Sequence, residues 1–160
     1  MISEAGISPD GLYRWWLFRR WSDKPIIIWI MMNPSTADHT KDDPTIRKVI
    51  RYYTKWGHGS ILVLNIYAFR SSNPENLPQV MREAVGRLND WWIRVLFNFA
   101  VRKRIPVICA WGVKHEVRGT QVRRIAVDVG LKLRCLEVAL NGEPKHPRFL
   151  SEDLKPRGLP

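Results

Sequence analysis

The chain has 160 residues, 45% of them hydrophobic, which is enough for one domain with one core spanning residues 1–160. No apolar stretch approaches the roughly 18 residues typical of a membrane span, and the amino terminus lacks the pattern of a secretory signal, so we expect a cytoplasmic protein. Cys109 and Cys135 are too few for a disulfide framework, a zinc ribbon or a cysteine-bound cluster, so no metal and no other cofactor is implied.

The charge is strongly positive, with 26 Lys and Arg against 15 Asp and Glu and a net charge of +11. A cationic surface of this size attracts phosphate polymers, and their binding depends on salt through counterion release. We therefore expect DNA as the partner, with no membrane and no obligatory protein partner. The alternative is a basic composition that has no bearing on function.

The first predicted elements lie near the amino terminus. Residues 13–21 (YRWWLFRRW) are aromatic and basic, residues 22–25 (SDKP) have the composition of a turn, and residues 26–32 (IIIWIMM) are apolar at every position. A continuous apolar run indicates a strand that is buried on both faces, as in a parallel sheet. The pattern predicts a hairpin that leads into a central strand.

A helix is predicted next. Asp42 and Asp43 supply an N-cap and Pro44 suits the first turn, while Gly57 ends the helix. Its apolar positions at helical spacing are Ile46, Val49, Ile50 and Tyr53.

Three further strands are expected at residues 61–66, 106–111 and 131–138. Helices are expected at residues 89–101 and in the stretch that ends at Gly130, with apolar positions at Val117, Val122, Ile125, Ala126 and Val129. Alternating strands and helices predict an α/β fold of three layers, α/β/α, with a mostly parallel central sheet of about four strands and an added strand from the N-terminal hairpin.

Polar residues follow each predicted strand of this sheet. Ligands of such folds bind outside the carboxyl ends of the strands, so these residues are the candidates for a site. They are Asn33-Pro34-Ser35, then Asn65 and Tyr67, then Trp111-Gly112 with Lys114 and His115, and last Lys145-His146-Pro147-Arg148-Phe149.

Two asparagines stand out among them. Pro34 holds Asn33 extended at a strand tip, although the same residues also suit an ordinary turn. Asn65 interrupts the apolar run ILVLNI, where an amide is costly to bury without partners. An amide both donates and accepts, which suits reading the edge of a base, and a structural hydrogen bond is the alternative.

The other candidates are a histidine, a carboxylate and an aromatic wedge. His146 lies in a loop with Arg148 and Phe149, a cation for phosphate and an aromatic ring that can enter a base stack. Asp38 is a candidate general base, whereas Asp42 and Asp43 are better explained as helix caps. The chain has no GxSxG, Walker or GxGxxG motif, which argues against a serine nucleophile and against nucleotide-triphosphate and dinucleotide chemistry.

These motifs resemble those of an uncharacterised bacterial and phage family typified by an NPSTAD loop. The matching segments are residues 30–38 (IMMNPSTAD), 43–47 (DPTIR), 62–70 (LVLNIYAFR) and His146-Pro147. More distantly, Asn33-Pro34, Asn65, Trp111-Gly112 and His146-Pro147 resemble, in the same order, the landmarks of the uracil-DNA glycosylase superfamily. Arg148 stands where that superfamily usually has Ser, and Asn33 is similar to its mismatch-specific branch.

The resemblance implies a DNA glycosylase without a cofactor, which flips a uracil-like, mismatched or modified base out of DNA and leaves an abasic site. The catalytic candidates are Asn33, His146 and Asp38. The base-binding candidates are Asn65, Tyr67, Phe69, Pro34 and Ser35. The DNA-binding candidates are Arg148, Phe149, Lys145, Arg47, Arg51, Lys114 and Arg70. The phage members of the family suggest modified viral DNA as substrate and a role in phage defence.

Two alternatives stay open from the sequence. One is a non-catalytic nucleic-acid-binding module of the same fold, which would shift DNA with a steep salt dependence and leave it intact. The other is an enzyme that acts on free nucleosides or nucleotides, which would ignore the polymer.

Overall fold

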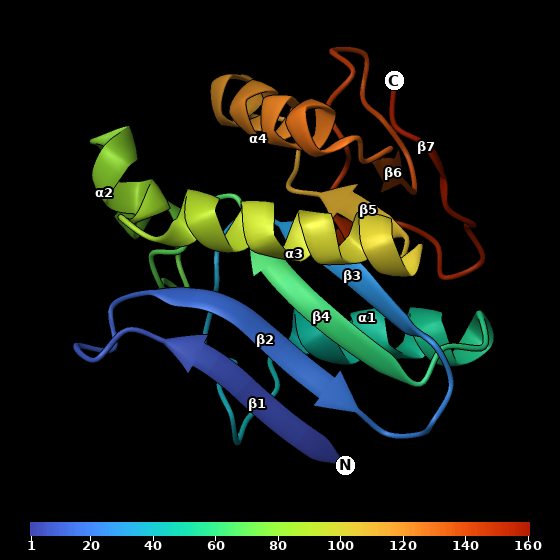
Figure 1. Cartoon of the computed structure of the whole chain (residues 1–160). Coiled ribbons are helices and arrows are strands. Elements are labelled where there is room, and N and C mark those ends of the chain that lie inside the picture. Colours follow the sequence, from blue (N-terminus) through green and yellow to red (C-terminus); the bar gives the residue numbers. More distant parts are fainter.

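One mixed sheet of seven strands and four α-helices make up the structure, a computed structural model that describes all 160 residues (Figure 1). The strands are β1 (Ile2–Ile7), β2 (Arg14–Arg20), β3 (Ile26–Met31), β4 (Ser60–Asn65), β5 (Val107–Ala110), β6 (Arg134–Cys135) and β7 (Arg157–Gly158). The helices are α1 (Pro44–Lys55), α2 (Met81–Val85), α3 (Asn89–Lys103) and α4 (Glu116–Val129), with short 3-10 turns η1 (Pro74–Asn76) and η2 (Pro147–Phe149).

The strands are ordered β1-β2-β4-β3-β5-β6-β7 across the sheet. β4, β3, β5 and β6 run parallel, while β1, β2 and β7 add antiparallel pairings at the two sides. The expected α/β class is therefore confirmed. The expected sheet was too small, because the four parallel strands are extended by three antiparallel ones.

The predicted hairpin between residues 13–21 and the central strand is wrong. β3 has β4 on one side and β5 on the other, so neither edge of β3 is free for β2. β2 pairs instead with β4, where Trp16 lies opposite Leu64, and with β1, where Ala5 lies opposite Leu17. The hairpin that does form joins β1 and β2.

Two other expectations need correction. The strand expected at residues 131–138 is reduced to Arg134–Cys135, because the amides of Ala139 and Lys145 bond to the carbonyls of Glu143 and Glu137 and fold the chain back on itself. In α4, Val117 is exposed, whereas the buried face consists of Arg118, Gly119, Val122, Ile125 and Ala126.

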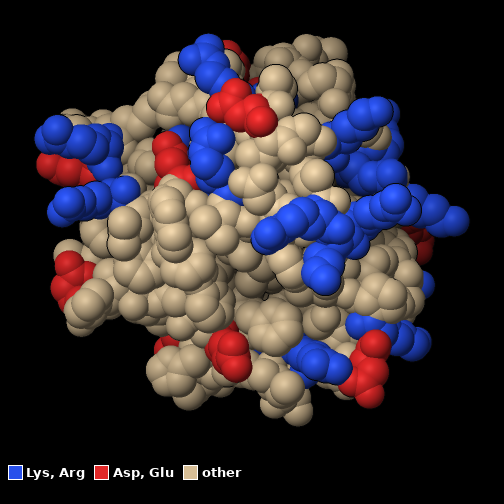
Figure 2. Space-filling model, viewed as in Figure 1, with Lys and Arg blue, Asp and Glu red and all other residues tan.

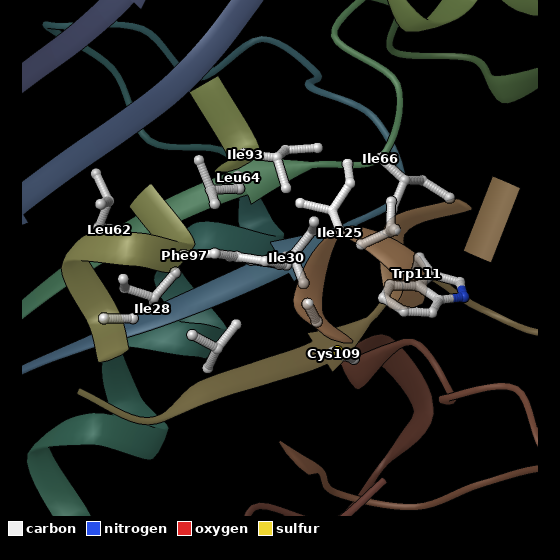
Figure 3. Packing of buried hydrophobic residues seen from close by; sticks show 14 of the residues in the cluster. Ile28, Ile30, Leu62, Leu64, Ile66, Ile93, Phe97, Cys109, Trp111 and Ile125 are labelled. Atoms are coloured by element: carbon white, nitrogen blue, oxygen red, sulfur yellow. The ribbon is translucent and has the colours of Figure 1, made fainter. Parts of the chain in front are cut away.

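Hydrophobic clusters cover both faces of the sheet. On one face, Ile30, Cys109 and Trp111 pack with Phe97 of α3 and Ile125 of α4 (Figure 3). On the other face, the apolar side of α1 packs against β3 and β4, as its residue pattern predicts. The helices are all too short or too polar to span a membrane. Since α1 begins near the carboxyl end of β3, its first turn lies beside the predicted site.

Candidate functional site

The loop from Asn33 to Asp43 is held by a buried arginine of β2. Arg19 is 1% exposed, and its Nε donates to Asp42 Oδ1 at 2.8 Å. The other guanidinium nitrogens donate to main-chain carbonyls, including those of Asp38 and of Lys41, the latter at 3.1 Å. One side chain therefore fixes the second half of the loop onto the sheet.

A second buried arginine, Arg14, links the same loop to Asn65. Its Nη1 donates to the carbonyl of Ala37 at 2.6 Å and its Nη2 to Asn65 Oδ1 at 3.3 Å. Burial lowers the pKa of Arg14 to about 10, and the nearby carboxylate of Asp43 opposes this shift. Asn65 thus has the partner that a buried amide needs. Asn65 is 1% exposed, and its Nδ2 donates to no protein group.

His146 lies near one of the same charges, the carboxylate of Asp43. Its Nδ1 accepts the backbone N–H of Arg148 at 3.2 Å, so the neutral ring carries its proton on Nε2. Burial lowers the pKa of His146 to about 4, the Arg148 cation adds to this shift, and Asp43 opposes it. The imidazole is therefore neutral near pH 7 and presents a single N–H donor.

Asp43 begins helix α1. It is 7% exposed, and its Oδ1 accepts the backbone N–H of Ile46 at 2.9 Å. The structure thus confirms the predicted N-cap. Because Asp43 acts on both Arg14 and His146, one carboxylate joins the helix start to the candidate site.

Asp43→Ala is expected to lower the free energy of unfolding by about 1–2 kcal/mol, the upper part of the range for a lost N-cap. The reason is that it removes both the cap of α1 and the compensating charge beside buried Arg14. Urea denaturation measures the effect. Asp23→Ala is the matched control, because the Asp23 side chain is 96% exposed and should change stability little. Equal midpoints for the two variants would contradict this role of Asp43.

Asn33 is fixed by its own amide group. Its Nδ2 donates to the carbonyl of Ser71 at 2.9 Å and to that of Pro34 at 3.1 Å, and the amide of Ser71 bonds back to Pro34 at 2.9 Å. Asn33 Oδ1 receives no hydrogen bond from the protein. The residue thus holds two loops together and keeps one acceptor for a ligand or a water.

Asp38 is committed to a turn. Its Oδ1 accepts hydrogen bonds from the backbone and hydroxyl of Thr40 and from the amide of Lys41, at 2.7 to 2.9 Å. These bonds lower its pKa to about 2. A carboxylate with so low a pKa is a weak general base. The catalytic prediction for Asp38 stays untested, and its contacts give it a structural task.

The two aromatic rings expected to stack on a base already have ring partners. The Tyr67 hydroxyl lies 3.2 Å from His115 Nδ1, and burial raises the pKa of Tyr67. The Phe69 ring packs edge-on against Tyr13, with 5.6 Å between centroids. Of the other residues predicted to bind the base, Pro34 is buried and Ser35 is half-buried.

The residues predicted to bind DNA differ in their exposure and in whether they already have partners within the protein. Phe149 is 85% exposed, with the Arg148 guanidinium 5.3 Å from the ring centroid, and Lys114 is exposed. The other four already have partners: Arg51 with Glu152, Lys145 with Glu137, Arg47 with the carbonyl of Asp42, and Arg70 with that of Gly11. Arg148, Phe149 and Lys114 are therefore the most available of this set.

Sequence reasoning missed the buried ionic groups. Trp111 Nε1 donates to Glu143 Oε2 at 2.6 Å, and Arg123 pairs with the same carboxylate at 2.6 Å. This arrangement ties residue 143 to the end of β5 and gives Trp111 a structural role. The signal for Glu143 was weak, since it lies in a loop 32 residues beyond Trp111. No group of three or more His, Cys, Asp or Glu side chains is placed to hold a metal ion.

A cavity of about 1050 Å³ lies beside this site rather than within it. The turn between β1 and β2, helix α2 and the first turns of α3 and α4 line it, and Asn33, Asn65 and His146 do not. The predicted rim residues and this cavity are therefore separate features.

Comparison with known proteins identifies a family but no characterised relative. A family model described as "Protein of unknown function (DUF1643)" matches residues 14–148, which is most of the chain. No match was found among curated proteins or among solved structures.

Proposed function

We propose that this chain, which belongs to the DUF1643 family of proteins of unknown function, is a DNA glycosylase with a three-layer fold like that of uracil-DNA glycosylases. The observation that carries the proposal is the state of His146. Its Nδ1 is occupied by the Arg148 amide and its pKa is lowered to about 4, which leaves a neutral ring with a fixed Nε2–H donor.

Base excision needs such a donor. As the bond between the base and C1′ of the sugar breaks, negative charge develops on the base and positive charge on the sugar. His146 would donate to an oxygen of the departing base. A neutral imidazole suits this task, because it stabilises the charge through a hydrogen bond without having to lose a proton.

The two asparagines would bind the reactants. Asn33 Oδ1, which has no donor in the protein, would orient the water that adds to C1′. It cannot take the proton of that water as a carboxylate would, so this proton passes to the departing base anion, and the base must be a good leaving group. Asn65 Nδ2 would donate to a carbonyl of the extruded base, because its Oδ1 is occupied by Arg14.

Two further features support the proposal. The parallel strands are ordered β4-β3-β5-β6, and each is followed by one landmark of the resemblance: Asn65, Asn33, Trp111 and, after the turn beyond β6, His146. Exposed Phe149, with Arg148 beside it, suits filling the gap that a flipped base leaves in a duplex.

A non-catalytic DNA-binding module is the second candidate. Asp38, the one carboxylate of the NPSTAD loop, favours it. The Oδ1 of Asp38 accepts three hydrogen bonds within a turn, and such a carboxylate is a weak general base. Such a module would use the same exposed Arg148 and Phe149.

The proposal is tested with duplex and single-stranded DNA that carries uracil, mismatched thymine or bulky modified pyrimidines. We expect release of free base and alkali-labile abasic sites from at least one of these, because the site holds a neutral donor and a free amide acceptor. DNA that is bound but stays intact in every case would favour the binding module. Activity on free nucleosides alone would point to the third class of protein.

A further inference from the structure

An exposed tryptophan near the start of α3 is supported by three others. The Trp91 side chain is 56% exposed, and its ring packs edge-on against Trp92, with 4.9 Å between centroids. Trp92 in turn stacks on Trp15 at 6.4 Å and meets Trp16 at 6.1 Å. We name Trp15, Trp16, Trp91 and Trp92 the tryptophan cluster. It holds the Trp91 indole in one place, so a ligand that stacks on it loses little additional freedom.

Arginines lie near Trp91 along the chain. Arg94 lies one helical turn after Trp91 on α3, and its pairing with Asp128 at 3.3 Å is exposed and therefore weak. Arg82 and Arg87 have no hydrogen bond or ion pair of their side chains within the protein. Figure 2 shows basic side chains over α2, at the upper left, beside a broad uncharged surface around the start of α3.

The cavity of about 1050 Å³ reaches the tryptophan cluster at Trp15, whereas Trp91 and Arg94 do not line it. Trp15, Arg82, Arg87 and Leu88 all line it, and Trp15 is itself part of the tryptophan cluster. Of its three carboxylates, Asp90 pairs with Arg118, while Asp10 and Glu83 keep their charges, because the hydrogen bonds from the Ser8 hydroxyl and the Leu12 amide do not neutralise Asp10. The cavity lining is therefore balanced in charge, and the cations nearest to Trp91 in the sequence are Arg87 and Arg94.

We infer that this surface binds single-stranded DNA, with a base stacked on Trp91 and the phosphates on either side held by Arg87 and Arg94. Exposed aromatic rings beside cations are the chemistry of single-strand binding, because every base has a face that stacks. A duplex hides these faces. The inference rests on the proposed function only in taking DNA as the polymer. It adds that the protein prefers DNA in which a segment next to the target base is unpaired.

Fluorescence anisotropy with an unmodified 15-nucleotide single strand of thymidines tests the inference. Trp91→Ala should weaken binding by about 5- to 150-fold, the range for loss of one stacked base, while Trp91→Phe should keep most of the affinity. Binding to a duplex of the same length should change much less. Arg87→Ala should lower the slope of log affinity against log salt by about 0.7, whereas Arg134→Ala, at the opposite end of the sheet, should not.

Two results would overturn the inference. One is a Trp91→Ala variant that binds the single strand as well as the parent does. If that variant also changes self-association in sedimentation, the patch is a protein interface. The other is an equal loss for single strand and duplex. Because this assay needs no turnover, its failure leaves base excision standing, and failure of the abasic-site assay leaves strand binding standing.

Discussion

Replacing Arg19 with methionine is expected to lower the free energy of unfolding by about 3 kcal/mol. The guanidinium is 1% exposed and donates to Asp42 and to main-chain carbonyls of the loop, so its removal leaves several buried acceptors without donors. Breaking a buried ion pair by removing one partner costs about 3–5 kcal/mol, and partial exposure of Asp42 places this pair at the lower end. Urea denaturation followed by circular dichroism measures the change.

The next residue along β2 provides the control. Arg20 has the same side chain but pairs with exposed Asp23, and exposed pairs contribute little to stability. Arg20→Met should therefore leave the unfolding midpoint nearly unchanged. Hydrogen exchange should also show faster exchange of the Lys41 and Asp38 amides in Arg19→Met than in Arg20→Met. Similar midpoints and similar exchange in both variants would show that Arg19 does not hold the loop.

Arg14 and Arg19 also show where sequence reasoning stops. In the segment YRWWLFRRW the arginines look like the solvated positions of a strand, because charged side chains are usually exposed. Their acceptors in the loop from Asn33 to Asp43 lie 19 or more residues further along the chain, and no periodicity fixes the path of that loop. The burial of Asn65 was predictable, since it sits within an apolar run, but its partner Arg14 was not.

The sequence predicted those elements that are defined by residues close together in the chain, such as α1. Asp43, Pro44 and the spacing of Ile46, Val49 and Tyr53 define α1 without reference to the rest of the chain. Strand pairing depends on which edges are free, so the sequence did not reveal that β2 pairs with β4. Residues 136–146 are set by the Glu143 contacts with Trp111 and Arg123, and for that reason β6 is shorter than its apolar pattern indicates.

The candidate site was predicted as four strand ends, and the structure divides them. His146, Asp43, Arg14 and Asn65 share one charged cluster beside the start of α1. Tyr67 and His115 form a separate pair near Arg118 of α4. Order along a sheet edge gives the strand at which a residue lies, but not the face to which its side chain turns. For this reason the sequence did not reveal that Tyr67 pairs with His115.

Substitution of His146 should reduce base excision by about 100- to 1000-fold, the cost of removing one donor to the developing charge. His146→Asn is the informative variant, because a carboxamide oxygen can still accept the Arg148 amide and cap η2 but has no donor at the position of Nε2. His146→Ala removes both. Single-turnover release of base measures the rate. His58→Ala, at the amino end of β4, is the control and should keep the parent rate.

The pH dependence of the same rate tests how His146 acts. With a pKa of about 4, the ring stays neutral throughout the range from about pH 5 to 8, so the rate should be nearly flat there. If the imidazolium were the active form, the rate would fall about tenfold for each unit of pH above the pKa, as the protonated fraction declines. Two observations together would identify the neutral ring as the donor. The rate of the parent should be flat and then drop below about pH 4.5, and His146→Asn should lose the activity. A steep fall between pH 6 and 8 would instead require a protonated group, and the role given to the Arg148 amide in fixing the tautomer would be wrong.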